Sequence, residues 1–361
     1  MEPINNSIIY RVKFSKMHGA GNDFVCFETN KVERINSFDK SEISLKELKD
    51  ISLILADRKY GVGCDQLIIC NNNPKVEKSA HYEMIVINSD GQQATMCGNG
   101  VRCFSKFVID NKIESKSLNG TPKKDETTSE IEQKVETLAG LIITYPQIYH
   151  HLNTRNVMMV KVNMGNALVL KTNKWKESYG TVLNNKQSID KSAYLETVEL
   201  NLPNCKQLEC VLVSMGNPHC IVFLQRNIEL GYLNKEECSN LKTMKIEDIA
   251  VALQKHPLFT DSCNVEFVYQ SNENKLSNTV ISRVYERGAG ETLACGTGAS
   301  AVAVASILMG HCDSEKEVTC SMPGGDLLIQ WGSGNKNVFK TGPACTVFSS
   351  QIDIEINRQI E

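Results

Sequence analysis

Two short glycine-rich turns carry the residues of this sequence that are best suited to chemistry. One turn reads Cys97-Gly98-Asn99-Gly100, and the other reads Cys295-Gly296-Thr297-Gly298. An apolar stretch with helical character follows each turn, and Asn99 and Thr297 are suitable N-cap residues. The first N–H groups of a helix bind carboxylates or phosphates, and the same field lowers the pKa of a nearby cysteine. We therefore expect a reactive thiol in each turn.

A pair of opposed thiols suits the inversion of a carbon stereocentre. One thiolate can remove the α-proton of an amino acid from one face, while the other thiol delivers a proton to the opposite face. The two helix N-termini can bind the substrate carboxylate and stabilise the charge that spreads onto it. Because the carboxylate itself is the electron sink, this chemistry requires no cofactor, and we assign no metal site.

The two turns lie in halves of the chain that look like copies of one another. Four pairs of polar residues recur at nearly constant spacing along the sequence. The spacing is 198 residues for Cys97 and Cys295, for Gln66 and Asn264 and for Asn88 and Glu286, and it is 195 for Asn22 and Asn217. This agreement predicts an internal duplication that gives two similar domains with one shared site.

Short β-like runs and two helices predict a mixed α/β fold. The two helices are expected over 101–110 and 299–309, directly after the cysteine turns. The strands are expected at 8–14, 24–27, 66–70, 82–87, 141–145, 157–162, 209–213, 220–224, 265–269, 279–285, 327–331 and 344–348.

Four polar segments are predicted to be surface insertions without chemistry. They cover residues 31–49, 112–136, 171–207 and 225–255. The second has few large apolar side chains and is expected to be mobile. In the fourth, a helix is possible because Leu241, Met244 and Ile249 could line one face.

Length and composition exclude several classes of protein. A chain of 361 residues suggests two domains, and a net charge of −3 gives no general attraction to nucleic acid or anionic membranes. Residues 292–312 are uncharged, but their glycines, hydroxyl side chains and His311 favour a buried helix over a membrane span. The N-terminus lacks the pattern of a secretory signal, so we expect a cytoplasmic protein.

Fourteen cysteines without any C-x-x-C motif do not indicate a disulfide framework or a zinc ribbon. Most of them, such as Cys26, Cys70 and Cys220, stand among apolar residues. We expect these to be reduced thiols that serve as small buried hydrophobic side chains.

Eight blocks of sequence resemble the diaminopimelate epimerase family, whose members are cofactor-independent amino-acid epimerases. They run in family order from Phe14 to Gly342, and together they are highly specific. The blocks are FSKMHGAGNDFV (14–25), YGVGCDQLI (60–68), INSDG (87–91), MCGNGVRCF (96–104), SMGNPHC (214–220), CNVEFV (263–268), YERGAGETLACGTGA (285–299) and MPGGDLLI (322–329).

The resemblance implies a fold, a reaction and an assembly. It implies two pseudo-symmetric α/β domains, each a curved mixed sheet or open barrel around a central helix. The domains would comprise residues 1–155 with 343–361 and residues 156–342, with the active site in the cleft between them. The implied reaction converts LL-2,6-diaminopimelate to the meso form in lysine and peptidoglycan-precursor synthesis, and the implied assembly is a homodimer.

The resemblance also implies roles for individual residues. Cys97 and Cys295 match the two catalytic cysteines, and His219 and Glu286 match residues that support the acid–base step. From the sequence context alone, His219 is equally well explained as an ordinary turn residue. The residues that match substrate contacts are Asn22, Gln66, Asn88, Gly98, Asn99, Asn217, Asn264, Glu286, Arg287, Gly296 and Thr297, of which Arg287 should bind a carboxylate through two hydrogen bonds.

Two features depart from the family pattern. The chain is longer than is usual, and the excess lies in the polar segments. Phe348 stands where the family usually has a tyrosine linked to dimer contact, which puts the dimer geometry in doubt more than the chemistry.

Three alternatives remain open from the sequence. A histidine- or proline-type racemase would share both cysteines, and deuterium release from several amino acids would distinguish it. A nucleotide-binding protein is suggested only by the loose match Gly296-x-Gly298-x-x-Ala301, which follows no clear hydrophobic strand. A thiol or metal module would use Cys97, Cys103, Cys295 and His219, but Cys103 is better explained as helix core.

Overall fold

The structure is a computed structural model that divides into two compact units. Unit 1 comprises Met1–Val162 and Pro343–Glu361, and unit 2 comprises Asn163–Gly342. The sequence predicts the boundaries at 155/156 and 342/343, and the units of the structure divide at 162/163 and 342/343. The described residues are 7–74, 79–117, 120–123, 130–147, 157–169, 181–182, 195–203, 205–259, 261–270, 277–331 and 337–357. Among these residues, no helix is long and apolar enough to cross a membrane.

Unit 1 surrounds one central helix with strands. Its elements are β1 (Ser7–Gly19), β2 (Asn22–Arg34), α1 (Leu45–Ala56), β3 (Gln66–Asn71), β4 (Tyr82–Asn88), β5 (Gln93–Ala94), α2 (Gly100–Asp110), β6 (Gln133–Thr137) and β7 (Gly140–Gln147). Strands β8 (Val157–Asn166) and β19 (Asn337–Asn357) carry the chain between the units. The pairing follows β1–β2–β3–β4–β6–β7–β8–β19 and returns to β1. Helix α2 contacts β1, β2, β3, β4 and β7, and its inward side chains are buried.

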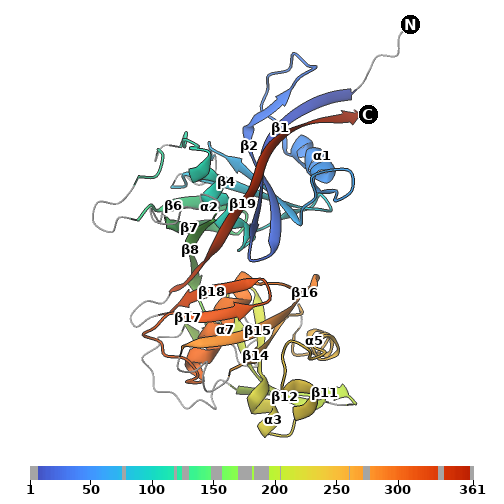
Figure 1. The fold of residues 1–361 in the computed structure, drawn as a ribbon, viewed down its shortest axis with the longest axis vertical. Coiled ribbons are helices and arrows are strands. Elements are labelled where there is room, and N and C mark those ends of the chain that lie inside the picture. The colour runs from blue at the N-terminus through green and yellow to red at the C-terminus, as the bar shows by residue number, and fades with distance from the viewer. Residues whose placement is uncertain are drawn as a thin grey trace. The chain divides into compact units, whose positions relative to one another are not determined.

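Unit 2 repeats this plan around helix α7. Its elements are β9 (Leu168–Val169), β10 (Thr181–Val182), β11 (Leu195–Leu202), β12 (Cys205–Ser214), β13 (Pro218–Phe223), α3 (Leu224–Glu229), α4 (Lys235–Cys238), α5 (Glu247–Gln254), β14 (Asn264–Tyr269), β15 (Thr279–Glu286), β16 (Gly290–Thr292), α7 (Gly296–Leu308), β17 (Val318–Met322) and β18 (Gly325–Gln330). Helix α7 is apolar on all sides and contacts β12 to β15, β17 and β18. In Figure 1, α2 and α7 each lie among the strands of their own unit.

The strand pairings around the two central helices correspond. β2 and β3 are parallel, as are β13 and β14; β4 and β6 are parallel, as are β15 and β17. Registers match as well: Phe24 pairs with Gln66 in unit 1, and His219 pairs with Asn264 in unit 2. The structure therefore has the mixed α/β fold of two similar units that the sequence predicted, and all twelve predicted strands and both predicted helices are present.

The polar segments contain more structure than predicted. Residues 31–49 include the start of α1, an amphipathic helix with a capping box between Ser44 and Glu47. Residues 112–136 include β6, and residues 171–207 include β11. These segments were misjudged because each half-buried element alternates its apolar residues with charged ones, so that composition alone indicates a surface.

The fourth polar segment holds three short helices, α3 to α5. Leu241, Met244 and Ile249 are all buried in the core of unit 2, as expected. They do not share one helix, because α5 begins only at Glu247 and the first two lie in the preceding turns. Much of segments 112–136 and 171–207 lies outside the described residues.

The cysteines are mostly buried, as predicted. Twelve are buried, whereas Cys97 and Cys345 are half-buried. Burial raises the pKa of the Cys26 and Cys70 thiols well above the ordinary value.

Because these thiols are buried, the free energy of unfolding of the protein should decrease at alkaline pH. The Cys26 and Cys70 thiols stay protonated in the folded chain, but they ionise in the unfolded chain above about pH 8.5. The free energy of unfolding should therefore fall between pH 7 and pH 9.5, by roughly 1 kcal/mol per thiol, in urea titrations. Cys26→Ala should reduce this difference between the two pH values. A difference that is unchanged in the variant would contradict the assignment.

Candidate active site

The polar residues predicted for the first half of the site gather at one edge of unit 1. Asn22 is the first residue of β2, Gln66 is the first of β3, and Asn88 is the last of β4. Because β2 and β3 are parallel and β4 is antiparallel to β3, these three positions lie at the same end of the sheet. The Cys97 turn leads into α2 at that end, and the Cys97 thiol donates to Asn22 Oδ1 over 3.7 Å.

The corresponding residues of unit 2 gather in the same way. Asn217 directly precedes β13, Asn264 is the first residue of β14, and Glu286 is the last of β15. Asn217 reaches the turn at the start of α7, since its Nδ2 donates to Thr297 Oγ1 over 3.3 Å. The duplication has thus kept the placement of the polar residues relative to the cysteine turn.

Each cysteine sulfur caps the helix that follows it. The N–H of Gly100 donates to Cys97 Sγ over 3.3 Å, and the N–H of Gly298 donates to Cys295 Sγ over 3.4 Å. Of the two predicted N-caps, the position of Asn99 is confirmed and that of Thr297 is wrong. Cys295 is the N-cap of α7, and Thr297 lies inside the helix, while Asn99 occupies the N-cap of α2 without a side-chain capping bond. In both turns, the sulfur that accepts from the helix belongs to the residue two positions before the predicted cap.

The environment of Cys295 opposes ionisation. Its side chain is only 6% exposed, and burial raises its pKa well above the ordinary value, with smaller contributions from Glu286 and Glu266. Thr297 and the N–H of Gly298 act in the opposite direction. The expectation of a lowered pKa at this helix N-terminus is therefore wrong for Cys295, because loss of solvation outweighs the hydrogen bonds.

Asn22 is held by a charged network that the sequence analysis missed. Its Nδ2 donates to Asp65 Oδ2 over 2.6 Å, which leaves Oδ1 directed at Cys97. Arg58 bridges Asp65 and Asp23, and Lys16 also binds Asp23. Although burial alone would raise the pKa of Asp23, the bonds from Arg58 and Lys16 lower it well below its usual range. The matching charges around the GNDF and CDQ blocks could have signalled this network.

Other unit 1 contacts fix the turn and its neighbours. Gln66 Nε2 donates to Asn88 Oδ1 over 2.8 Å. Arg102 is fully buried, and its Nη1 donates to Gly98 O and to Asn99 Oδ1. A buried cation on α2 therefore holds the turn. At the equivalent position of unit 2, the hydroxyl of Ser300 donates to Gly296 O.

His219 is buried completely and lies between two oxygen atoms. Its Nδ1 is 2.7 Å from Glu266 Oε1, and its Nε2 is 3.1 Å from Asn217 Oδ1. Glu266 was not among the predicted site residues, although it lies in the CNVEFV block. It is the one charged residue of that strand, and a charged strand residue is normally assigned to the solvent-facing side.

The remaining predicted residues lie beside this group. Glu286 accepts a short hydrogen bond from Thr292 Oγ1, and Asn264 Oδ1 accepts from the backbone N–H of Arg287. The side chain of Arg287 is exposed, and its Nη1 donates to Asp261 O over 2.7 Å. Asn264 is thereby oriented by the backbone at the end of β15, while the guanidinium lies at the surface of the unit.

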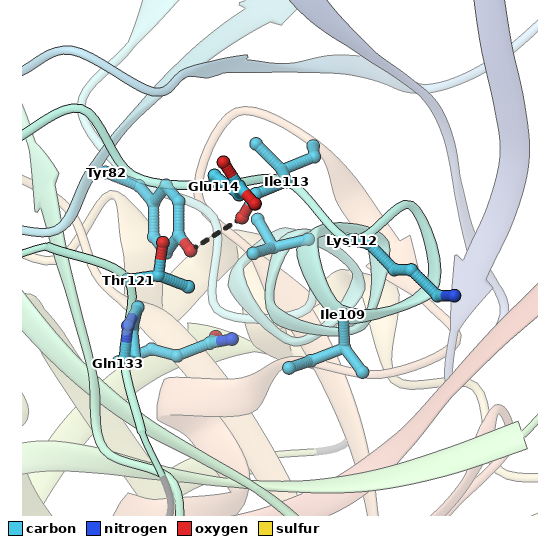
Figure 2. A pocket seen from close by; sticks show the side chains of 9 residues that line it. Tyr82, Ile109, Lys112, Ile113, Glu114, Thr121 and Gln133 are labelled. Carbon is cyan, nitrogen blue, oxygen red and sulfur yellow. Dashed lines mark hydrogen bonds between the residues drawn. The ribbon is translucent and has the colours of Figure 1, made fainter.

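A pocket of about 230 Å³ lies elsewhere, at the opposite end of α2 from Cys97. Figure 2 shows Tyr82, Ile109, Lys112, Ile113 and Gln133 around it, with the Tyr82 hydroxyl bonded to Ile113 O. None of the predicted site residues lines this pocket. Among the residues that the structure describes, no three histidine, cysteine or acidic side chains converge as metal ligands would.

Comparison with known proteins identifies one family over most of the chain. The family model described as Diaminopimelate epimerase matches residues 14–169 and 211–347. The diaminopimelate epimerase of Acetivibrio thermocellus is 34% identical over 346 residues, which cover 95% of this chain and 99% of the relative. That of Methanococcus maripaludis is 35% identical over 345 residues, with 95% and 100% covered.

Solved structures of lower identity share the fold. A methylitaconate-delta-isomerase has a TM-score of 0.58 at 13% identity and covers 95% of each chain. A hydroxyproline epimerase from Agrobacterium vitis has a TM-score of 0.57 at 13% identity, with 95% of this chain and 91% of that one covered.

The two turn cysteines should differ in reactivity. Cys97 is half-buried, whereas Cys295 is buried with a raised pKa. We expect iodoacetamide at pH 8 to alkylate Cys97 at least about tenfold faster than Cys295, measured by peptide mass spectrometry over time. The fully buried Cys26 serves as an internal control and should react no faster than Cys295. Equal rates at Cys97 and Cys295 would contradict the described environment.

Proposed function

The chain belongs to the diaminopimelate epimerase family, and from this premise we propose that Cys97 and Cys295 perform its reaction as a two-base pair. The protein is an isomerase that interconverts LL- and meso-diaminopimelate in lysine biosynthesis. What supports the two-base proposal is the duplicated construction of the turns, in which each sulfur caps a helix at the same end of an equivalent sheet.

The proposed reaction moves one proton off the substrate and one onto it. A thiolate on one side takes the α-proton and becomes a thiol, while the electron pair of the broken C–H bond spreads onto the carboxylate. The thiol on the other side gives its proton to the opposite face of the carbon and becomes a thiolate. The stereocentre is inverted, the two sulfurs have exchanged protonation states, and no net charge is gained.

We assign the resting proton to Cys295. Its burial and its acidic neighbours Glu286 and Glu266 favour the thiol, which is the form that donates a proton. Cys97 would then begin as the base in that direction, with the N–H of Gly100 stabilising its thiolate. His219 would support the acid–base step through Asn217 and Thr297, and Glu286 through its charge.

Substrate recognition follows from the polar residues around each turn. The N–H groups of Gly98 and Asn99 and of Gly296 and Thr297 would bind the reacting carboxylate at the positive ends of α2 and α7. The amides of Asn22, Gln66, Asn88, Asn217 and Asn264 would contact the amino and carboxylate groups, and Arg287 would bind the distal carboxylate. Diaminopimelate would be the small-molecule partner.

We further propose a cytoplasmic homodimer. The exposed apolar side chains of Val347 and Phe348 lie together on β19, and the ring of Phe348 packs edge-on against Phe14 at 6.0 Å. An aromatic surface is thus retained where the family has tyrosine, and it suits a second copy of this chain better than water.

Loss of either thiol should abolish epimerisation. In Cys97→Ser and in Cys295→Ser, a hydroxyl replaces the sulfur and is far too weak a base at neutral pH. We expect each variant to lose at least about 1,000-fold in kcat for LL-to-meso conversion, followed by chromatography in heavy water. Either variant should still eliminate halide from a β-halo analogue in one direction, since this needs one base. Epimerisation at the wild-type rate by either variant would exclude the two-base mechanism.

The distal carboxylate should make the enzyme selective. Arg287→Lys keeps the charge but loses the planar fork, so kcat/KM on diaminopimelate should fall at least about tenfold. Lysine lacks the second carboxylate and should be a poor substrate of the wild type. Arg11→Lys, on β1 and paired with Asp353, is the control that should leave kcat/KM unchanged. If the wild type converts lysine or histidine as well as diaminopimelate, a general racemase replaces this assignment.

A further inference from the structure

The interior beneath the two cysteine turns differs between the units, although the strands correspond. In unit 2, His219 and Glu266 occupy neighbouring strands β13 and β14, in the registers that Phe24 and Ile68 occupy on β2 and β3. The Glu266 carboxylate and the Ile68 side chain make the same approach to the turn. A Cβ on Gly298 would lie 2.6 Å from Glu266 Oε1, and a Cβ on Gly100 would lie 2.7 Å from Ile68 Cδ1. Unit 2 therefore has a buried polar pair at the positions where unit 1 has an apolar pair of similar shape.

The polar pair begins a continuous series of hydrogen bonds that ends at the Cys295 sulfur. Glu266 Oε1 is 2.7 Å from His219 Nδ1, and His219 Nε2 is 3.1 Å from Asn217 Oδ1. Asn217 Nδ2 donates to Thr297 Oγ1 over 3.3 Å, and Thr297 Oγ1 is 3.4 Å from Cys295 Sγ. Every member of the series belongs to unit 2.

The chemistry of these atoms gives the series a direction. An amide oxygen only accepts hydrogen bonds, so His219 Nε2 must carry a proton toward Asn217. A second proton is then shared between His219 Nδ1 and Glu266 Oε1. The Asn217 amide donates to Thr297 Oγ1, which leaves the hydroxyl proton of Thr297 directed at the sulfur. All donors in the series therefore point from His219 toward Cys295.

Glu266 determines this direction because it occupies His219 Nδ1. Without that contact, a neutral imidazole can carry its single proton on Nδ1 and accept at Nε2. The Asn217 amide would then reverse, and the Thr297 hydroxyl would donate to the amide oxygen instead of the sulfur. The carboxylate itself is fully buried, and Glu266 Oε2 has no hydrogen-bond partner among the described residues. A buried carboxylate oxygen without a hydrogen bond lowers the free energy of unfolding. Stability of the fold therefore does not explain a glutamate at this position.

We propose that Glu266 is a positioning residue that directs the Thr297 hydroxyl at the Cys295 sulfur through His219 and Asn217. The Thr297 proton stabilises the thiolate that Cys295 becomes after it donates to the substrate, and which it must be when it acts as the base. The series thus counteracts the effect of burial on this thiol. Its importance for catalysis rests on the proposed two-thiol function, but its effect on the sulfur does not.

Two substitutions of Glu266 distinguish the effect of its hydrogen bond to His219 from the effect of its negative charge. Glu266→Asp keeps the carboxylate but withdraws it by about 1.5 Å, which breaks the contact with His219 Nδ1. Glu266→Gln removes the charge, but its amide can still donate to Nδ1 and keep the proton on Nε2. A role through charge alone predicts that Gln is the more severe change and Asp the milder one, whereas positioning predicts the reverse.

The readout is the rate at which iodoacetamide alkylates each cysteine of the full-length protein, followed by peptide mass spectrometry from pH 7 to pH 10. In Glu266→Asp, we expect alkylation of Cys295 to slow by about tenfold at pH 8, with its pH profile moved to higher pH. In Glu266→Gln, the rate should stay within about threefold of wild type. Cys97, in unit 1, should be unchanged in both variants, and Ile68→Val is the matched control at the equivalent position.

A double-variant cycle tests whether the effect passes through Thr297. Thr297→Val removes the hydroxyl and should slow Cys295 alkylation as Glu266→Asp does, and the combined variant should be no slower than Thr297→Val alone. Additive effects, equal slowing at Cys97, or an unchanged rate at Cys295 in folded Glu266→Asp would each overturn the proposal.

A second variant covers the case in which Glu266→Asp does not fold. His219→Phe combined with Glu266→Ile installs the pair that unit 1 already accommodates at these positions, and it should slow Cys295 about tenfold while sparing Cys97. Its failure to slow Cys295 would overturn the proposal. Epimerase assays of the same proteins keep the two hypotheses apart, because an inactive wild type would refute the proposed function and leave the alkylation result standing.

Discussion

The close approach of a helix N-terminus to the strand beneath it is the contact on which both units depend. It places a cysteine sulfur within hydrogen-bonding reach of the N–H three residues later, and it requires glycine at that position. Any Cβ on Gly100 or Gly298 would overlap Ile68 or Glu266 in the strand below. The helix, the parallel strand pair that supports it and the polar residues at the strand ends are therefore fixed together, so that duplication of the sequence duplicates the site.

This duplicated arrangement can be predicted from the sequence. The repeated C-G-x-G turns and the spacings of 198 and 195 residues correspond to identical strand registers, with Phe24 opposite Gln66 and His219 opposite Asn264. The strands and both central helices were also predictable, because buried strands and an apolar helix leave a strong local pattern. The polar residues were assigned to a site through the resemblance to the family, and the structure places them at or beside the ends of these strands.

Features that depend on three-dimensional neighbours could not be predicted. Helix α1 was missed because its charged face dominates its composition, although the capping box at Ser44 and Glu47 and the apolar positions of Leu48, Ile51 and Leu55 mark it in retrospect. The acidity expected of Cys295 was wrong because a helix N-terminus can be recognised in a sequence, but the extent of burial cannot. Glu266 escaped notice because a charged residue in a strand is normally assigned to the solvent-facing side.

The duplicated scaffold places its two turn cysteines in different environments, since Cys97 is half-buried whereas Cys295 is buried. Backbone geometry is alike at the two turns, because in each a sulfur accepts a hydrogen bond from the N–H three residues later. The proton affinity of each sulfur can nevertheless be set separately by side chains that point inward from the supporting strands, and these are the positions at which the units differ. The apolar side chains of Phe24 and Ile68 lie beneath the Cys97 turn. At the equivalent positions beneath the Cys295 turn lie the ionisable side chains of His219 and Glu266. The two units thus share the geometry of the cysteine turn but differ in the buried side chains beneath it.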